Sequence, residues 1–194
     1  MLQIYRTGLA ICLLASGTGG LAVAAEPAAP PVAAAAAPSV RIGFANPVLM
    51  VRDLDRSVRF YTEVMGYTVV ARSDITAPVS QRTVGSTRDQ RTRSVYLDSA
   101  KLVTREIPAS HIALVHIDDA SLPQMNRGTN PDDAVQGEVM LSLVVEGLDE
   151  LLRRLERGGY RILNAAQPSA SGKSRIASAL DPDGIRLELY EYLR

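Results

Sequence analysis

Two carboxylates and one imidazole lie in or beside segments that are predicted to be strands, and apolar and polar residues alternate strictly around one of the carboxylates, Glu188. They are Glu188, Glu138 and His116. Such a set suits Mn²⁺ or Fe²⁺, and two carboxylates in unlike environments can act as general acid and base. These three residues are therefore the candidate catalytic and metal-ligating residues. The competing interpretation is structural: Glu188 pairs with Arg186 or a tyrosine, and His116 is a half-buried polar residue.

Other familiar catalytic arrangements are missing from the sequence. The two histidines, His111 and His116, have no nucleophile signature beside them. The one cysteine, Cys12, lies in the N-terminal leader. We therefore expect a mature chain without a thiol for a disulfide, a nucleophile or a metal.

The N-terminal residues predict export. Residues 1–25 resemble a secretory signal peptide: Arg6 supplies positive charge, residues 9–16 are apolar but too short to span a bilayer, and residues 23–25 are small enough for cleavage. Residues 26–39 are almost entirely Ala and Pro, which predicts a flexible linker. We expect a periplasmic or secreted protein with no membrane span once the signal is removed.

The charge balance bears on the partners. The 21 basic and 21 acidic residues cancel, and no basic stripe carries interleaved aromatic side chains, which argues against nucleic-acid binding. The arginines at 82, 88, 91 and 93 could hold an anion, although such clusters are more often simply solvated. The expected partner is a small-molecule ligand, and a homodimer is left open.

The remaining region, residues 40–194, contains two copies of one unit, at 40–118 and 137–194, joined by a linker at 119–136. Each copy contains a strand, a helix with apolar residues at helical spacing and a glycine stop, and three further strands. Leu54-Asp55 recurs as Leu148-Asp149, and Gly66-Tyr67 recurs as Gly159-Tyr160. Asp53 or Asp55 can cap the first helix. The strands after the helices are expected at residues 67–71, 92–97 and 111–117, and at 160–163, 175–180 and 185–192. Both copies therefore read βαβββ, and residues 72–91 are predicted to be a loop able to act as a lid.

Two motifs carry a family resemblance. They are Val-Arg-Asp-Leu-Asp-Arg-Ser-Val-Arg-Phe-Tyr-Thr-Glu-Val-Met-Gly at residues 51–66 and Asp-Pro-Asp-Gly-Ile-Arg-Leu-Glu-Leu at residues 181–189. Together with the repeat, they resemble the vicinal oxygen chelate superfamily, which contains glyoxalase I, bleomycin resistance and extradiol dioxygenase proteins. The resemblance covers residues 42–192. It implies an α+β fold in which paired βαβββ modules form a curved mixed sheet around a cup.

The resemblance also implies where a metal would bind. Family enzymes hold a divalent metal in the cup through His and Glu side chains from up to four strands. The corresponding positions here are Asn46, Leu114, Met140 and Glu188, and only Glu188 has the family's chemistry. We therefore expect no cofactor. The rival is a displaced divalent-metal site formed by His116, Glu138 and Glu188.

Strand alternation predicts which residues line the cup. The predicted ligand-binding residues are Asn46, Val48, Met50, Leu114, His116, Met140, Ser142, Glu188 and Tyr190. The leading hypothesis is an exported protein that binds a small organic molecule there without a metal. One alternative is a metal-dependent lyase, isomerase or ring-cleaving dioxygenase, and another is an interaction module tethered by its Ala/Pro arm.

Overall fold

The computed structural model describes residues 46–102, 107, 109–124, 130, 132–134 and 136–193. The predicted signal peptide and linker lie outside the described residues. The first module contains β1 (Val48–Met50), α1 (Leu54–Arg59), the π-helix η1 (Phe60–Val64), β2 (Thr68–Asp74), α2 (Pro78–Thr83), β3 (Thr92–Asp98) and β4 (His111–Ile117). The second contains β5 (Met140–Val144), α3 (Leu148–Arg157), β6 (Ile162–Pro168), β7 (Ser174–Leu180) and β8 (Arg186–Tyr192).

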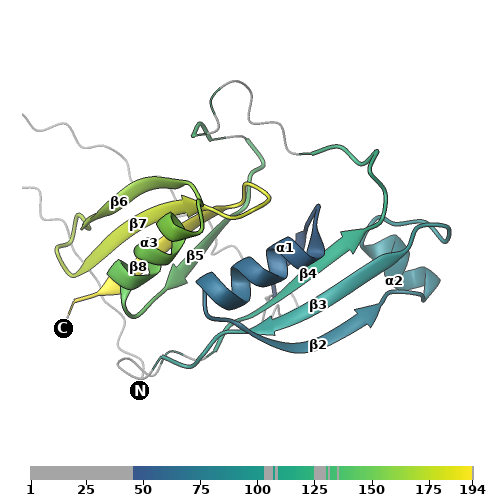
Figure 1. Ribbon diagram of the computed structural model, residues 1–194, viewed down its shortest axis with the longest axis horizontal. Helices are drawn as coiled ribbons and strands as arrows, with labels where there is room; N and C mark the ends of the chain where they lie inside the picture. The colour runs from purple at the N-terminus through teal and green to yellow at the C-terminus, as the bar shows by residue number, and fades with distance from the viewer. Residues whose placement is uncertain are drawn as a thin grey trace, which may run out of the picture. The chain divides into compact units, whose positions relative to one another are not determined.

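Both modules have the same strand order, which confirms the predicted repeat and the α+β class. The sheets run β1-β4-β3-β2 and β5-β8-β7-β6 (Figure 1). In each sheet the first pair is parallel and the other pairs are antiparallel. None of the helices formed by the described residues is long and apolar enough to cross a membrane.

The helix of the first module begins at a side-chain cap. Asp53, one of two predicted caps, accepts a hydrogen bond from the Arg56 backbone N–H at 2.9 Å. Leu54 and Val58 are buried, as is Tyr61 in the π-helix that continues α1. Gly66 follows with φ +80°, a conformation that side chains rarely adopt, and so ends the helix.

The helix of the second module is capped from a distant strand. Gly147 precedes α3 in a left-handed conformation and has no side chain with which to cap it. Instead, Glu191 of β8 accepts hydrogen bonds from the backbone N–H groups of Gly147 and Leu148 at 2.8 and 3.0 Å. A carboxylate at this end also complements the helix dipole. The start of α3 is therefore tied to the end of β8.

The predicted loop at residues 72–91 is wrong in part. Strand β2 continues to Asp74, and α2 forms within the segment. Pro78 lies in the first turn of α2, where its missing N–H costs nothing. Gln81 of this helix is buried, and Arg91 pairs with Asp74 at 3.7 Å. The short helix was missed because its six residues are too few to show helical periodicity.

Each main helix covers one face of its sheet, α1 in the first module and α3 in the second (Figure 1). We call the opposite face of each sheet its open face. The strand residues that face the helices lie in the core or packed against it: Leu49, Val51, Leu141, Leu143, Val145, Leu187 and Leu189. The apolar residues of this core come from both modules.

Leu114 and His116 were predicted to line the cup, on the open face of the first sheet, and this prediction is wrong. Leu114 pairs with Leu49 across β1 and β4 and is fully buried in the helix-covered core. His116 lies two residues further along β4, so its side chain shares that face. The error is one residue of register, which moves every side chain of a strand to the other face.

The Asp-Pro-Asp-Gly turn joins the modules. The Tyr61 hydroxyl donates to Asp181 Oδ2 at 2.9 Å, and both residues are buried. Asp181 Oδ1 also accepts from the backbone N–H groups of Asp183 and Ile185, at 2.9 and 2.7 Å. Two residues after Asp181, Asp183 accepts a hydrogen bond at Oδ2 from the Ser57 hydroxyl at 2.7 Å. The turn that starts β8 is therefore held against the helix of the first module.

Burial shifts the pKa values of the two side chains in this contact, Asp181 and Tyr61. It raises the pKa of Asp181 to about 6, although the hydrogen bonds from Ile185 and Tyr61 act in the opposite direction. It also raises the pKa of Tyr61 well above its usual value, with the neighbouring Asp181 carboxylate adding to the effect. Tyr61 therefore remains a donor at neutral pH, and Asp181 carries a charge that burial disfavours.

Asp181 makes stability depend on pH in a direction that can be tested. The pKa of Asp181 is higher in the folded protein than in the unfolded chain, so the folded protein binds its proton more tightly. The stabilisation that this gives is fully present below pH 4 and is lost as pH rises to about 6. The loss is at most about 3 kcal/mol. Urea denaturation should find wild type losing more stability than Asp181→Asn between pH 4 and pH 7. A stability difference between the two proteins that is independent of pH would contradict this.

The register of β4 predicts an asymmetry between two leucines. Leu114→Ala should lower the free energy of unfolding by about 2–5 kcal/mol, because Leu114 is fully buried. Leu122→Ala is the matched control, since Leu122 is 40% exposed and should cost less than about 1 kcal/mol. Chemical denaturation measures both. Equal costs would place Leu114 outside the core.

Candidate functional site

Four of the predicted ligand-binding residues share the open face of the second sheet. Ser142 pairs with Glu188 across β5 and β8, and Met140 and Tyr190 lie two residues from them along the same strands. Alternation turns all four away from α3, because Leu187 and Leu189 occupy the core. The prediction that these residues share one face is therefore confirmed.

Apolar side chains are exposed on both open faces. Val48 and Met50 on β1 are 51% and 47% exposed, and Met140 on β5 is 47% exposed. Tyr96 on β3 is 44% exposed and lies on the same face as Val48, because both pair with Ala113. Asn46, just before β1, is also exposed. Clustered exposed apolar groups are a common mark of a binding surface.

Polar anchors accompany these groups on the second sheet. Tyr190 donates a hydrogen bond from its hydroxyl to Glu188 at 2.9 Å, and this bond raises the pKa of Tyr190. Arg186 lies 3.4 Å from a Glu138 oxygen, and both side chains are largely buried. Glu188 is therefore paired with a tyrosine, one of the two structural interpretations considered from the sequence.

The displaced metal site is not assembled. The His116 ring nitrogen Nδ1 lies 3.0 Å from the Val51 carbonyl oxygen on the helix-covered face, whereas Glu188 lies on an open face. Glu138 is engaged by Arg186. Among the described residues, no group of three His, Cys, Asp or Glu side chains could hold a metal. The structure therefore does not bring together the three candidate ligands of the rival metal site.

The four positions expected from the family also fail to fit a metal. The Val51 N–H donates to the Val115 carbonyl in the first module, and the Val145 N–H donates to the Tyr190 carbonyl in the second. Val115 therefore corresponds to Tyr190. Two residues earlier in each strand, Ala113 rather than Leu114 corresponds to Glu188. The four positions are then Asn46, Ala113, Met140 and Glu188. A methyl group cannot ligate, and a thioether does not suit the divalent metals of oxygen-rich sites. One carboxylate and one amide do not make such a centre.

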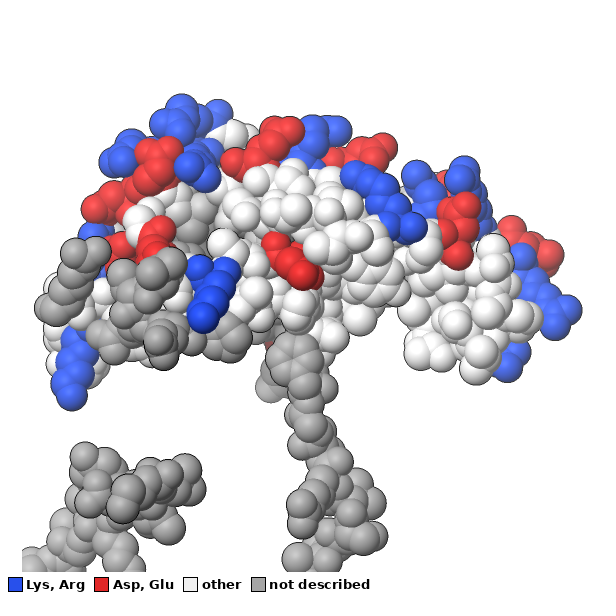
Figure 2. Space-filling model, turned by 90° about the horizontal axis from the view of Figure 1, so that it is seen from below, with Lys and Arg blue, Asp and Glu red and all other residues white. Residues whose placement is uncertain are grey.

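Charges of both signs are mixed at the surface. Figure 2 shows basic and acidic side chains alternating along the upper edge of its view, above a largely uncharged area. The described residues in that view form no continuous basic stripe.

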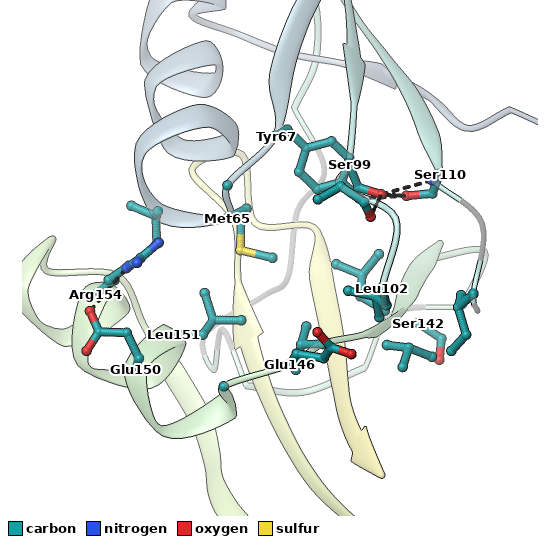
Figure 3. A pocket seen from close by; sticks show the side chains of 18 residues that line it. Met65, Tyr67, Ser99, Leu102, Ser110, Ser142, Glu146, Glu150, Leu151 and Arg154 are labelled. Carbon is teal, nitrogen blue, oxygen red and sulfur yellow. Dashed lines mark hydrogen bonds and ion pairs between the residues drawn. The ribbon is translucent and has the colours of Figure 1, made fainter. Parts of the chain in front are cut away.

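The sequence reasoning missed a pocket of about 510 Å³ that lies beside β5 (Figure 3). Its polar side chains include Tyr67, Ser99 and Ser110 of the first module and Glu146, Glu150 and Arg154 of the second. Most of them lie in loops and at element ends, where strand alternation carries no signal. The repeat of Gly66-Tyr67 as Gly159-Tyr160 indicated a helix stop but no pocket.

Comparison with solved structures shows the fold. A glyoxalase family protein from Bacillus cereus is 20% identical, with 82% of this chain and 100% of that chain covered and a TM-score of 0.64. A glyoxalase/bleomycin resistance protein/dioxygenase domain from Frankia sp. is 20% identical, with 80% and 95% covered and a TM-score of 0.50. A glyoxalase I mutant from Zea mays is 21% identical, with 76% and 47% covered and a TM-score of 0.51. At these identities the likeness concerns the fold.

A search of curated proteins found no match. The family model of the Glyoxalase/Bleomycin resistance protein/Dioxygenase superfamily matches residues 41–189, which include both βαβββ modules. The duplicated strand order, the solved structures and this match agree. The chain therefore belongs to the glyoxalase/bleomycin resistance protein/dioxygenase superfamily.

Proposed function

We propose that the mature protein is exported and binds a small organic molecule on the open faces of its sheets, without a metal. The observation that carries this proposal is the combination on the second sheet of an exposed Met140 with two polar pairs, Glu188–Tyr190 and Glu138–Arg186. Small-molecule sites have this composition: apolar contact area with a few positioned polar groups.

The side chains at the expected metal positions are poor metal ligands, which supports binding without a metal. Asn46, Ala113 and Met140 stand where three of the family ligands are expected, and His116 lies on a different face from Glu188. Binding energy must then come from apolar contact and from hydrogen bonds. Glu188 and Tyr190 supply an acceptor and a hydroxyl for the latter. A metal-dependent enzyme built on His116, Glu138 and Glu188 is not proposed.

Binding on the open faces is tested with Nile red, an uncharged apolar dye whose fluorescence rises on transfer from water. Met50→Ser and Met140→Ser should each weaken dye binding roughly tenfold, because each removes most of an apolar side chain. Val79→Ser is the control, since Val79 lies on α2 and is 64% exposed. Dialysis against EDTA should leave the affinity unchanged. Unaltered binding in both methionine variants, or a loss after EDTA that Mn²⁺ restores, would refute the proposal.

Export is tested by sequencing the N-terminus of protein recovered from the extracytoplasmic fraction of producing cells. We expect a mature start near residue 26, because the small residues at 23–25 offer the cleavage site. Leu13→Arg, which interrupts the apolar run, should leave full-length protein inside the cells. Extracytoplasmic protein that begins at Met1 would contradict the cleavage.

A further inference from the structure

The pocket beside β5 lies between the two modules of the chain. Its walls come from the end of η1 and the following turn, from Ser99, Ala100, Leu102, Ile107 and Ser110 between β3 and β4, from β5 and from the first turns of α3 (Figure 3). Met65 and Leu151 point into it from the two helical sides. Its volume of about 510 Å³ lies within the range of small-molecule sites.

One wall of this pocket is the edge of a sheet. Among the strands that the structure describes, β5 is the outermost of the second sheet and pairs only with β8. Residues 142–145 all line the pocket although their side chains alternate between faces, so the pocket borders the strand's edge. The Val145 N–H donates to the Tyr190 carbonyl of β8. By alternation, Ser142 and Val144 direct their backbone N–H and C=O groups away from β8, toward the pocket.

A second wall carries a directional chain of hydroxyl groups. The Ser110 hydroxyl and backbone N–H donate to Ser99 Oγ at 3.1 and 2.9 Å. The Tyr67 hydroxyl lies 3.1 Å from Ser110 Oγ. Because the Ser110 hydrogen is used toward Ser99, Tyr67 donates to Ser110. Its own oxygen keeps its lone pairs for a donor in the pocket. Burial raises the pKa of Tyr67, so this hydroxyl stays protonated at neutral pH.

The charges around the pocket disfavour an anion. Glu146, Glu150 and Arg154 are the charged side chains of its lining. Glu150 accepts hydrogen bonds from Arg153, Arg154 and Arg157, which neutralise it. Because Arg154 is already hydrogen-bonded to Glu150, an incoming carboxylate would have to compete with Glu150 for this cation.

The geometry points to a binding site in this pocket for a small, uncharged molecule with an apolar body and amide groups. An amide pairs its N–H and C=O with the β5 edge as a neighbouring strand would. A further N–H donates to the Tyr67 oxygen, and the apolar body contacts Met65, Leu143 and Leu151. This site shares Ser142 with the open face of the second sheet but is lined by neither Glu188 nor Tyr190, and it does not rest on the proposed function.

The test titrates N-acetyl-leucine N-methylamide into the ¹⁵N-labelled protein and follows binding in ¹H–¹⁵N correlation spectra. Saturable shifts are expected at the backbone amides of residues 142–147. Tyr67→Phe should weaken binding about fivefold, because one hydrogen bond is lost. Tyr160→Phe is the matched control and should leave the affinity unchanged, since Tyr160 holds the corresponding position in the second module and packs against Phe60 rather than lining the pocket.

Two related compounds test the chemistry without altering the protein. N-acetyl-leucine methyl ester lacks one N–H, and N-acetyl-leucine carries a carboxylate. Both should bind more weakly than the diamide. Equal binding of diamide and ester, or no saturable shift at residues 142–147, would overturn the inference. Shifts confined to Met140, Glu188 and Tyr190 would also overturn it, while supporting ligand binding on the open face.

Discussion

The hydrogen bond from Tyr61 to Asp181 is the contact on which the arrangement of the two modules depends. It joins the π-helix of the first module to the turn that starts β8 in the second. The same carboxylate accepts from the backbone of Asp183 and Ile185, so it fixes the turn as well as the partner. Burying an ionised carboxylate costs free energy, and these three donors offset that cost.

Strand β8 consequently serves three purposes through the alternation of its side chains. Leu187 and Leu189 fill the core, Glu188 and Tyr190 form a pair on the open face, and Glu191 caps α3. A shift of β8 by one residue would exchange the first two sets and bury the Glu188 carboxylate. The turn at Asp181 sets this register at the start of the strand. The contact that joins the two modules therefore also decides which side chains of β8 reach the open face.

Sequence reasoning was strong where a local pattern had a physical cause. The repeat of Leu54-Asp55 as Leu148-Asp149 predicted two βαβββ modules, and Asp53 was among the predicted caps. It failed where two segments had to be aligned. Matching β4 to β8 one residue out put Leu114 on the wrong face, because both faces of β4 are apolar and give no periodic signal. The short α2 was missed for lack of length.

The sequence by itself determined the duplicated strand order and the main helix of each module, because residue type and short-range spacing decide these. Only the tertiary structure decided that Tyr61 meets Asp181, that Glu191 caps a helix 43 residues away, and that a pocket borders the β5 edge. Each depends on contacts between segments far apart in the chain. Their distances are set by packing around a shared core, and local patterns do not encode them.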